Sequence, residues 1–401
     1  RQGQEMFVYI MIVAIFFALY FIVPQKHSAI PCVLFVLAMA VMSYFVQPGE
    51  TDDLARYFYI ISQIEKAGYE GFRQMLESNY FDFGSFPVCG YYFYFISILK
   101  NPHFLPFFTI LICYGCIILV IQKASVKFKV DKFYTMLALI FAISTYWYYD
   151  VCSGTRNGIA FTVTVACAYY HLVERKNIPL CIIGYVLACG MHSSGIVLVG
   201  LVAIAWLSCN FGSRIVNAAL ILSLAGGSAL LGIFGGMAKS DFMQSLLGKT
   251  ENALDNLGIT TQTNYFVNIA TFAVCAIIMF YCLPYIKKYV TDINQRRFFR
   301  FSEVLMCFML GTLLTSLLFL RLARWVLPIV AAVVYMVGMQ LQKSRLDAGL
   351  IDISYDSKSP GMEKIRAMNK GIFSFFVFVY SVIHFVYDIT GSSLIWLNLG
   401  I

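Results

Sequence analysis

The sequence predicts an all-α, polytopic integral membrane protein with about twelve transmembrane helices and one short re-entrant or interfacial segment. Of its 401 residues, 60% are hydrophobic and only 12% are charged. Soluble domains run at roughly 45–50% apolar and about 25% charged residues. A soluble fold of this length could not bury so much apolar surface. Composition therefore excludes a cytosolic enzyme, a disordered chain and a nucleic-acid-binding module.

Twelve apolar runs are the candidate spans, since about 20 apolar residues cross a bilayer as a helix. They lie at 6–24, 28–46, 104–122, 132–149, 158–173, 178–191, 194–208, 215–236, 265–286, 301–320, 325–342 and 371–390. The first run is long enough to span and is followed by no small-residue cleavage site. We therefore expect a membrane helix there and not a cleaved leader.

One further apolar run, Val88–Leu99, is too short for a full span and better suits a re-entrant or interfacial segment. Pro102 follows it and cannot continue a helical hydrogen-bond ladder. Residues 178–208 must instead form two spans, because the sequence from Gly190 to Gly195 supplies a break.

Lysine and arginine set the predicted orientation, since cytoplasmic loops of membrane proteins are enriched in them. Placing residues 25–27 in the cytoplasm puts 19 of the 29 basic residues on that side, including Arg296, Arg297 and Arg300. The net charge of +8 is therefore first a topology signal. This assignment holds only if Val88–Leu99 does not cross.

The chain reads as a single membrane domain, 1–401, with three longer connections. The outer segment 47–87 begins with an N-cap and first-turn acids at Thr51, Asp52 and Asp53. Its apolar residues then follow helical spacing up to Gly68, which predicts an amphipathic helix on the outer interface. Residues 237–264 form a polar outer loop or lid, and residues 343–370 a polar cytoplasmic loop.

The sequence offers neither a metal site nor a cofactor site. Most of the 12 cysteines lie inside apolar runs, where cysteine behaves as a small hydrophobic residue. Cys113 and Cys116 have a redox or zinc spacing, but no second pair accompanies them. His27, His103, His171 and His384 show no metal-ligand spacing, and no glycine-rich phosphate loop is present.

Arginines that face outward are the unusual ones, and three lie at predicted span ends. Arg156 precedes the run at 158–173, and Arg321 and Arg324 occupy the turn between 301–320 and 325–342. His192 and the group Asp52, Asp53 and Arg56 reach the same membrane face. Arginine forks match phosphate oxygens, so the set predicts a lipid-linked phosphate or pyrophosphate ligand.

Each of these residues also has a plainer interpretation. Arg321 and Arg324 would simply snorkel to headgroups. Arg156 would pair with Asp150, and His192 would be a satisfied turn residue. The two aspartates would cap a helix, with Asp53 and Arg56 as one i, i+3 ion pair.

The order of three motifs resembles the EpsG/Wzy-type bacterial polysaccharide polymerases. Thr51 to Tyr57 supplies an Asp-x-x-x-Tyr-like start, Arg156 heads a membrane helix, and a His-x-Ser turn begins at His192. The resemblance covers residues 5–210 well and the remainder only in hydropathy. Two departures are the extra second aspartate and Ser194-Gly195 in place of Ser-Ala.

This resemblance implies a polymerase of glycan repeats linked to undecaprenyl pyrophosphate, acting at the outer face of the bacterial cytoplasmic membrane. The fold would be similar to membrane-embedded GT-C-type glycosyltransferases. The product would be O-antigen, capsule or exopolysaccharide, and a chain-length regulator and a flippase would be partners. No nucleic acid is expected. We assign Arg156, Arg321 and Arg324 to pyrophosphate, Asp53 or His192 to the base, and Asp52 and Arg56 to the acceptor.

Two other classes stay open. An O-antigen ligase-like transferase would use the same donor with a different acceptor. A transporter or flippase of the lipid-linked oligosaccharide would carry charges or broken helices near the middle of the membrane. The notable charges here gather at one face, which favours an enzyme.

Overall fold

The structure is a computed structural model that describes residues 2–49, 52–209, 213–225, 262–312, 316–347 and 360–391. These residues are helices and short connections, and no strand occurs among them. The all-α class is therefore confirmed for this part of the chain. The predicted outer loop 237–264 lies almost entirely outside the described residues, as does Thr51.

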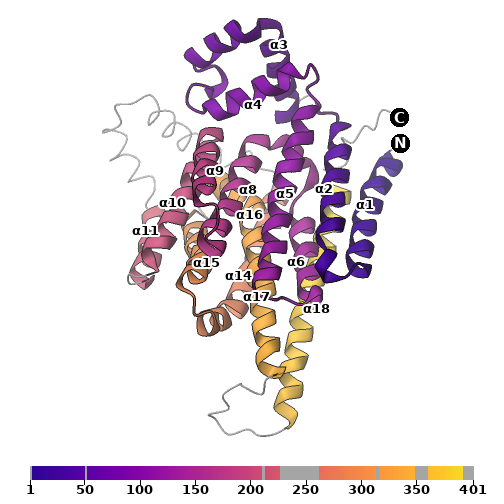
Figure 1. Ribbon diagram of the computed structural model, residues 1–401, viewed down its shortest axis with the longest axis vertical. Coiled ribbons are helices and arrows are strands. Elements are labelled where there is room, and N and C mark those ends of the chain that lie inside the picture. The colour runs from indigo at the N-terminus through magenta and orange to yellow at the C-terminus, as the bar shows by residue number, and fades with distance from the viewer. Residues whose placement is uncertain are drawn as a thin grey trace.

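The N-terminal half builds a bundle with a separate layer at one end (Figure 1). Its elements are α1 (Gln2–Ile22), η1 (Gln25–His27), α2 (Ala29–Tyr44), α3 (Asp53–Glu77), η2 (Tyr80–Asp82), α4 (Pro87–Ile98), α5 (Phe104–Lys127), α6 (Lys132–Thr145), α7 (Tyr148–Ser153), α8 (Thr155–Tyr169), η3 (Tyr170–Glu174), α9 (Ile178–Met191) and α10 (Ser193–Ser208).

The C-terminal half packs against the same bundle through α17 and α18, which both contact α6, and through α15, which contacts α10. Within this half, α14 lies against α17. Its elements are α11 (Ser213–Ala225), α14 (Gln262–Tyr289), α15 (Ile293–Gly311), α16 (Ser316–Trp325), α17 (Leu327–Asp347) and α18 (Pro360–Gly391).

Among the described residues, three helices are long and apolar enough to cross a membrane: Phe104–Lys127, Phe266–Tyr289 and Lys370–Thr390. The bent pair Phe319–Trp325 and Leu327–Ser344, with an angle of 45°, would be a fourth. Six further apolar helices are shorter. Together they make the chain a membrane protein, while the number of twelve spans stays a prediction.

Helices α3 and α4 form a cap over one end of the bundle (Figure 1). Leu54, Ile61 and Ile64 are buried on one face of α3, as the spacing predicted. Gly68 has a φ of 64°, so the helix kinks there before it continues to Glu77. The predicted amphipathic helix is therefore present and longer than expected. Helix α4 contains the twelve residues Pro87–Ile98 and packs against α3.

The connections assigned to the cytoplasm meet at the opposite end of the bundle. Lys132 donates hydrogen bonds to the carbonyls of Phe21 and Val23, at 2.6 Å each. Lys343 of α17 pairs with Asp131, which precedes α6. The sequence order of these loops thus agrees with their grouping at one end.

Two boundaries differ from the sequence prediction. The run 301–320 is not one helix, since α15 ends at Gly311 and α16 begins at Ser316. Arg321 and Arg324 therefore lie inside α16 and not in a turn. The predicted loop 343–370 is helical at both ends, in α17 and α18. Both boundaries were predicted from hydropathy alone. Hydropathy does not indicate where the hydrogen bonds of a helix end.

Candidate active site

Arg156 is buried at the start of α8, beneath the cap. Its side chain is only 9% exposed, and its Nε and Nη2 atoms have no hydrogen-bond partner. Nη2 lies 3.8 Å from Oδ2 of Asp82, which is ion-pair range and too long for a hydrogen bond. A buried donor without an acceptor costs about 1–3 kcal/mol, and more when charged. This guanidinium therefore has unused capacity for acceptor oxygens.

The helix that carries Arg156 adds to this preference for an anion. Arg156 is the second residue of α8, which follows Gly154. The first backbone N–H groups of a helix lack partners within the helix, and the helix dipole makes that end positive. A phosphate placed here would meet both the guanidinium and the helix N-terminus.

Aromatic rings of the cap hold the arginines in place. The guanidinium carbons of Arg56 and Arg156 each lie 5.0 Å from the centre of the Phe81 ring. The Phe86 ring lies 6.0 Å from that of Arg156. Such contacts between a cation and a ring face are favourable when partly desolvated. Phe81 thus joins an arginine of α3 to the arginine of α8.

The turn η2 presents Phe81 and Asp82 in an uncommon backbone conformation. Asn79, Phe81 and Asp82 have φ values of 54°, 53° and 63°. Asparagine and aspartate tolerate this left-handed region, whereas a bulky residue rarely adopts it. The burial of Phe83 and Phe86 in the cap holds the turn. Such conformations persist where the surrounding structure enforces them, and they are frequent at functional sites.

His192 forms the break between α9 and α10 and caps α10. Its backbone is extended, with φ −164° and ψ 151°. The Ser194 backbone N–H donates to Nδ1 of His192 at 3.1 Å, and the Ser194 hydroxyl lies 2.9 Å from the same atom. Because Nδ1 accepts a hydrogen bond, the neutral ring carries its proton on Nε2. His192 is therefore arranged as a donor at Nε2.

Two contacts connect this break to Arg156. The ring of His192 stacks on Phe86 at 5.9 Å and 16°, and Phe86 also contacts Arg156. The Ser194 hydroxyl lies 3.0 Å from Oδ1 of Asn157, the residue after Arg156. The predicted Arg156 and His192 are thus brought together.

The glycine that departs from the family pattern has a steric reason. A Cβ on Gly195 would lie 2.3 Å from the carbonyl oxygen of Ala188. Real Cβ atoms essentially never come so close to backbone, so α10 can leave the break at this angle only with glycine here.

Helix α16 approaches the start of α8 through a glycine pair. A Cβ on Gly154 or Gly158 would lie 2.6 Å or 2.7 Å from the ring of Trp325. The two glycines are four residues apart and share one face of the helix. The indole therefore fits against bare backbone, and this contact sets the distance between α16 and Arg156.

The two arginines of α16 have different surroundings. Arg324 pairs with Asp150, and its guanidinium carbon lies 4.3 Å from the centre of the Trp147 ring. Arg321 lies within electrostatic range of Asp53 and Arg156. The proposed pairing of Arg156 with Asp150 is wrong, because Arg324 holds that carboxylate. Burial raises the pKa of Asp150, and Arg324 opposes the shift.

Asp52 ties the cap to the bundle. Its Oδ2 accepts a hydrogen bond from the Gly49 backbone N–H at 2.9 Å and one from the hydroxyl of Tyr149. Although Asp52 is the N-cap residue of α3, its side chain makes no capping hydrogen bond. The plain helix-cap interpretation of this carboxylate is therefore wrong.

Asp53 and Arg56 form an ion pair of 2.8 Å, with side chains 58% and 56% exposed. Their i, i+3 spacing matches the plainer interpretation. Exposed pairs contribute little stability, about 0–1 kcal/mol, so both groups can exchange partners at small cost.

Sequence reasoning missed Asp82 and Trp325. Asp82 lies in an aromatic stretch with no helical or strand periodicity. The sequence did contain a signal for the contact with Trp325. Gly154 and Gly158 lie four residues apart, and two glycines at this spacing leave room on a helix face for a large side chain of a neighbouring helix. Among the described residues, no group of three or more His, Cys, Asp or Glu side chains could hold a metal ion.

The arrangement can bind an anion of several charges beside an acceptor hydroxyl. Arg56, Arg156 and Arg321 supply positive charge, and Asp53 supplies a carboxylate at the solvent-facing edge. Arginines can stabilise charge that develops on a leaving group, and a carboxylate can accept a proton.

A comparison with curated proteins gives no match. A family model, the EpsG family, matches residues 29–348, which is most of the chain and includes every residue of this candidate site. Members of this family are in general polysaccharide polymerases, and the family is associated with glycosyltransferase-like chemistry. The resemblance inferred from the three motifs is confirmed, and the chain belongs to the EpsG family.

Proposed function

We propose that this protein polymerises oligosaccharide repeat units linked to undecaprenyl pyrophosphate, at the outer face of the bacterial cytoplasmic membrane. The growing glycan is transferred from its lipid carrier to a sugar hydroxyl of the next lipid-linked unit. The bond between the sugar C1 and the pyrophosphate oxygen breaks, and the acceptor oxygen bonds to C1. The acceptor proton goes to a base, and undecaprenyl pyrophosphate leaves.

One observation carries the proposal: the buried Arg156 guanidinium has two nitrogen atoms without acceptors at the N-terminus of a helix. The family gives the general reaction, and this feature supports a pyrophosphate leaving group. Arg156 and Arg321 bind that group, and Asp82 balances the charge of Arg156 before substrate arrives. Arg324, held by Asp150, orients α16.

Asp53 is the proposed base. Its carboxylate is exposed and can reach a sugar hydroxyl after a small change of its pairing with Arg56. His192 is less suited, because Nδ1 already accepts the Ser194 N–H and Nε2 carries the proton. We propose that His192 donates to the pyrophosphate instead. Asp52 keeps the cap closed over the site, and Arg56 orients the acceptor.

Purified protein in liposomes with lipid-linked repeat units extracted from the source bacterium tests the reaction. Wild-type protein should give a ladder of glycans on a gel, and Asp53→Asn should give none. Arg73→Ala is a matched control, because Arg73 is an exposed cap residue paired with Glu77. A ladder of normal length from Asp53→Asn would remove Asp53 as base.

The alternative classes give different products in the same assay. A ligase-like transferase would add the glycan to an unrelated acceptor and give no ladder from repeat units alone. A transporter would move the lipid-linked unit without forming a glycosidic bond. Either result, with folded wild-type protein, would overturn the proposal.

A further inference from the structure

Helix α4 lies across one end of the bundle and presents a stripe of apolar side chains that no part of the fold covers (Figure 1). The stripe consists of Tyr91, Phe95 and Ile98, which are 53%, 45% and 58% exposed. These residues follow one another at intervals of four and three, so they share one face of the helix. The other faces of α4 pack against α3, α5 and α9. The stripe is therefore open to whatever surrounds the bundle at this level.

Contacts with α5 establish the level of α4 along the bundle. The Tyr92 hydroxyl donates to the carbonyl oxygen of Leu105 at 3.4 Å and lies 3.4 Å from the Thr109 hydroxyl. The ring centres of Phe95 and Phe108 lie 5.6 Å apart. Helix α5 is one of the three helices long and apolar enough to cross a membrane. Helix α4 therefore lies beside the first two turns of a span, and not above its end.

The start of α4 lies at a corresponding level. A Cβ on Gly190 would lie 2.5 Å from Cγ2 of Val88, so the last turn of α9 touches the first turn of α4. Both ends of α4 are thus level with the ends of apolar helices, and α4 runs along the membrane surface. The 24 residues of α5 extend over about 36 Å, whereas the hydrocarbon of a bilayer is about 30 Å thick. The end turns of α5 therefore reach the headgroup region.

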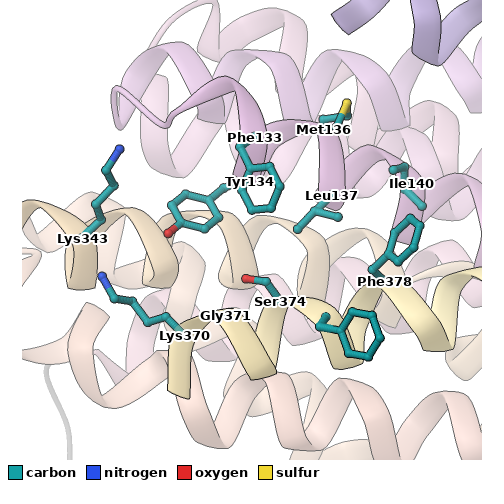
Figure 2. Close-up of a pocket in the computed structure, with 11 residues that line it drawn as sticks. Phe133, Tyr134, Met136, Leu137, Ile140, Lys343, Lys370, Gly371, Ser374 and Phe378 are labelled. Carbon is teal, nitrogen blue, oxygen red and sulfur yellow. The ribbon is translucent and has the colours of Figure 1, made fainter. Parts of the chain in front are cut away.

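Lipid is the partner that fits this depth and the composition of the stripe. Tyrosine is enriched where a membrane meets water, because its ring is apolar and its hydroxyl is polar. Phe378 of α18 offers a comparison within a long apolar span. Figure 2 shows it beside the groove between α6 and α18, where its side chain is 40% exposed. The stripe on α4 is exposed to a similar extent, and it adds the hydroxyl of Tyr91 for the headgroup layer.

We propose that α4 lies in the plane of the outer leaflet, where headgroups meet hydrocarbon, with its exposed stripe against lipid. The anion pocket has the same depth, because Phe86, the residue before α4, contacts both Arg156 and His192. The pocket lies level with lipid phosphates and takes its phosphate ligand from the membrane and not from solution. This second part rests on the proposed function, whereas the position of α4 does not.

Fluorescence quenching of the full chain in phosphatidylcholine liposomes tests the depth. A coumarin-bearing amino acid replaces Phe95 of the stripe, Phe378 in the middle of a span, or Arg73, an exposed cap residue on α3. The quenchers are lipids with a nitroxide at carbon 5 or carbon 12 of one acyl chain, and iodide in solution. The label at position 95 should be quenched at least twofold more by the shallow nitroxide than by the deep one. The label at position 378 should show the reverse order, and the label at position 73 should respond mainly to iodide.

Two results would overturn the position of α4. Strongest quenching of the label at position 95 by iodide would place α4 in water, and strongest quenching by the deep nitroxide would make α4 a re-entrant helix. The same label in place of Tyr91 repeats the measurement on the same stripe and decides the question if the first variant does not fold.

The source of the ligand is tested by the melting temperature of wild type and of Arg156→Ala in liposomes. Undecaprenyl pyrophosphate in the bilayer should raise the melting temperature of wild type but not of Arg156→Ala, and inorganic pyrophosphate at the same total concentration should leave both unchanged. An equal increase with inorganic pyrophosphate would overturn delivery from the membrane. No increase with either ligand would count against the proposed function and the second part of this inference, while the quenching result would still decide the position of α4.

Discussion

Replacing Arg156 by lysine separates a pyrophosphate ligand from a merely structural arginine. Lysine keeps the positive charge and can still interact with Asp82 and Phe81. It loses the planar fork, and with it the two nitrogen atoms that have no partner in the structure. A structural role should therefore survive the change, whereas bidentate recognition should not.

The size of the effect follows from the hydrogen bonds lost. A hydrogen bond to a charged group contributes about 1.5–3 kcal/mol. At about 1.4 kcal/mol for each tenfold change in rate, losing one such bond from the transition state slows polymerisation roughly ten- to a hundredfold. Arg156→Ala also leaves Asp82 without this cation, so its loss should be at least as large.

The assay is the gel ladder formed from lipid-linked repeat units, with equal protein in each membrane sample and the melting temperature checked. Arg73→Lys serves as the control within the cap. Polymer of normal length and rate from Arg156→Lys would refute the reasoning. Arg156 would then be a structural residue, and the pyrophosphate site would have to be sought elsewhere.

Four further outcomes are expected. Arg324→Ala should lower the melting temperature, because it leaves the carboxylate of Asp150 unpaired. Adding Asp150→Asn should restore most of the lost melting temperature, and no recovery would argue against the pair. Gly158→Ala should lower the free energy of unfolding by about 1–3 kcal/mol, because the added methyl overpacks against Trp325, and it should slow polymerisation. Adding Trp325→Leu should restore part of both. Unchanged activity of Gly158→Ala would mean that α16 need not approach α8 so closely. Polymerisation should continue in a metal chelator, since arginines stabilise the leaving group; loss that magnesium rescues would contradict this. External labelling should reach a cysteine placed beside His192 but not one beside Arg297, and the reverse pattern would invert the topology.

The sequence was informative wherever a periodic pattern or a break controls the backbone. Hydrophobic spacing located the buried face of α3, whereas Gly68, which was predicted to end this helix, only kinks it. The stretch around His192 located the boundary between α9 and α10 because an extended residue must separate two helices. The family motifs lie at these positions, which is why they could be recognised.

The partners of the charged residues could not be predicted, because they come from distant segments. Asp82 meets Arg156 only through a turn of left-handed residues that no periodicity reveals. Asp150 and Arg324 are 174 residues apart. The predicted turn holding Arg321 and Arg324 is a helix, because the real break, after Gly311, falls inside an apolar run.

The three arginines that the sequence predicts to face outward differ in the charge that they can offer a ligand. Arg324 is neutralised by Asp150 and stacks on Trp147, so it serves to fix α16 against α7. That fixation, with Trp325 against the glycines of α8, is what brings Arg321 into range of Arg156. The positive charges of Arg156 and Arg321 repel each other, whereas Asp53 attracts Arg321. A pyrophosphate would relieve this repulsion and accept hydrogen bonds from the two nitrogen atoms of Arg156 that lack partners, which is the physical reason to expect a multiply charged anion at this site.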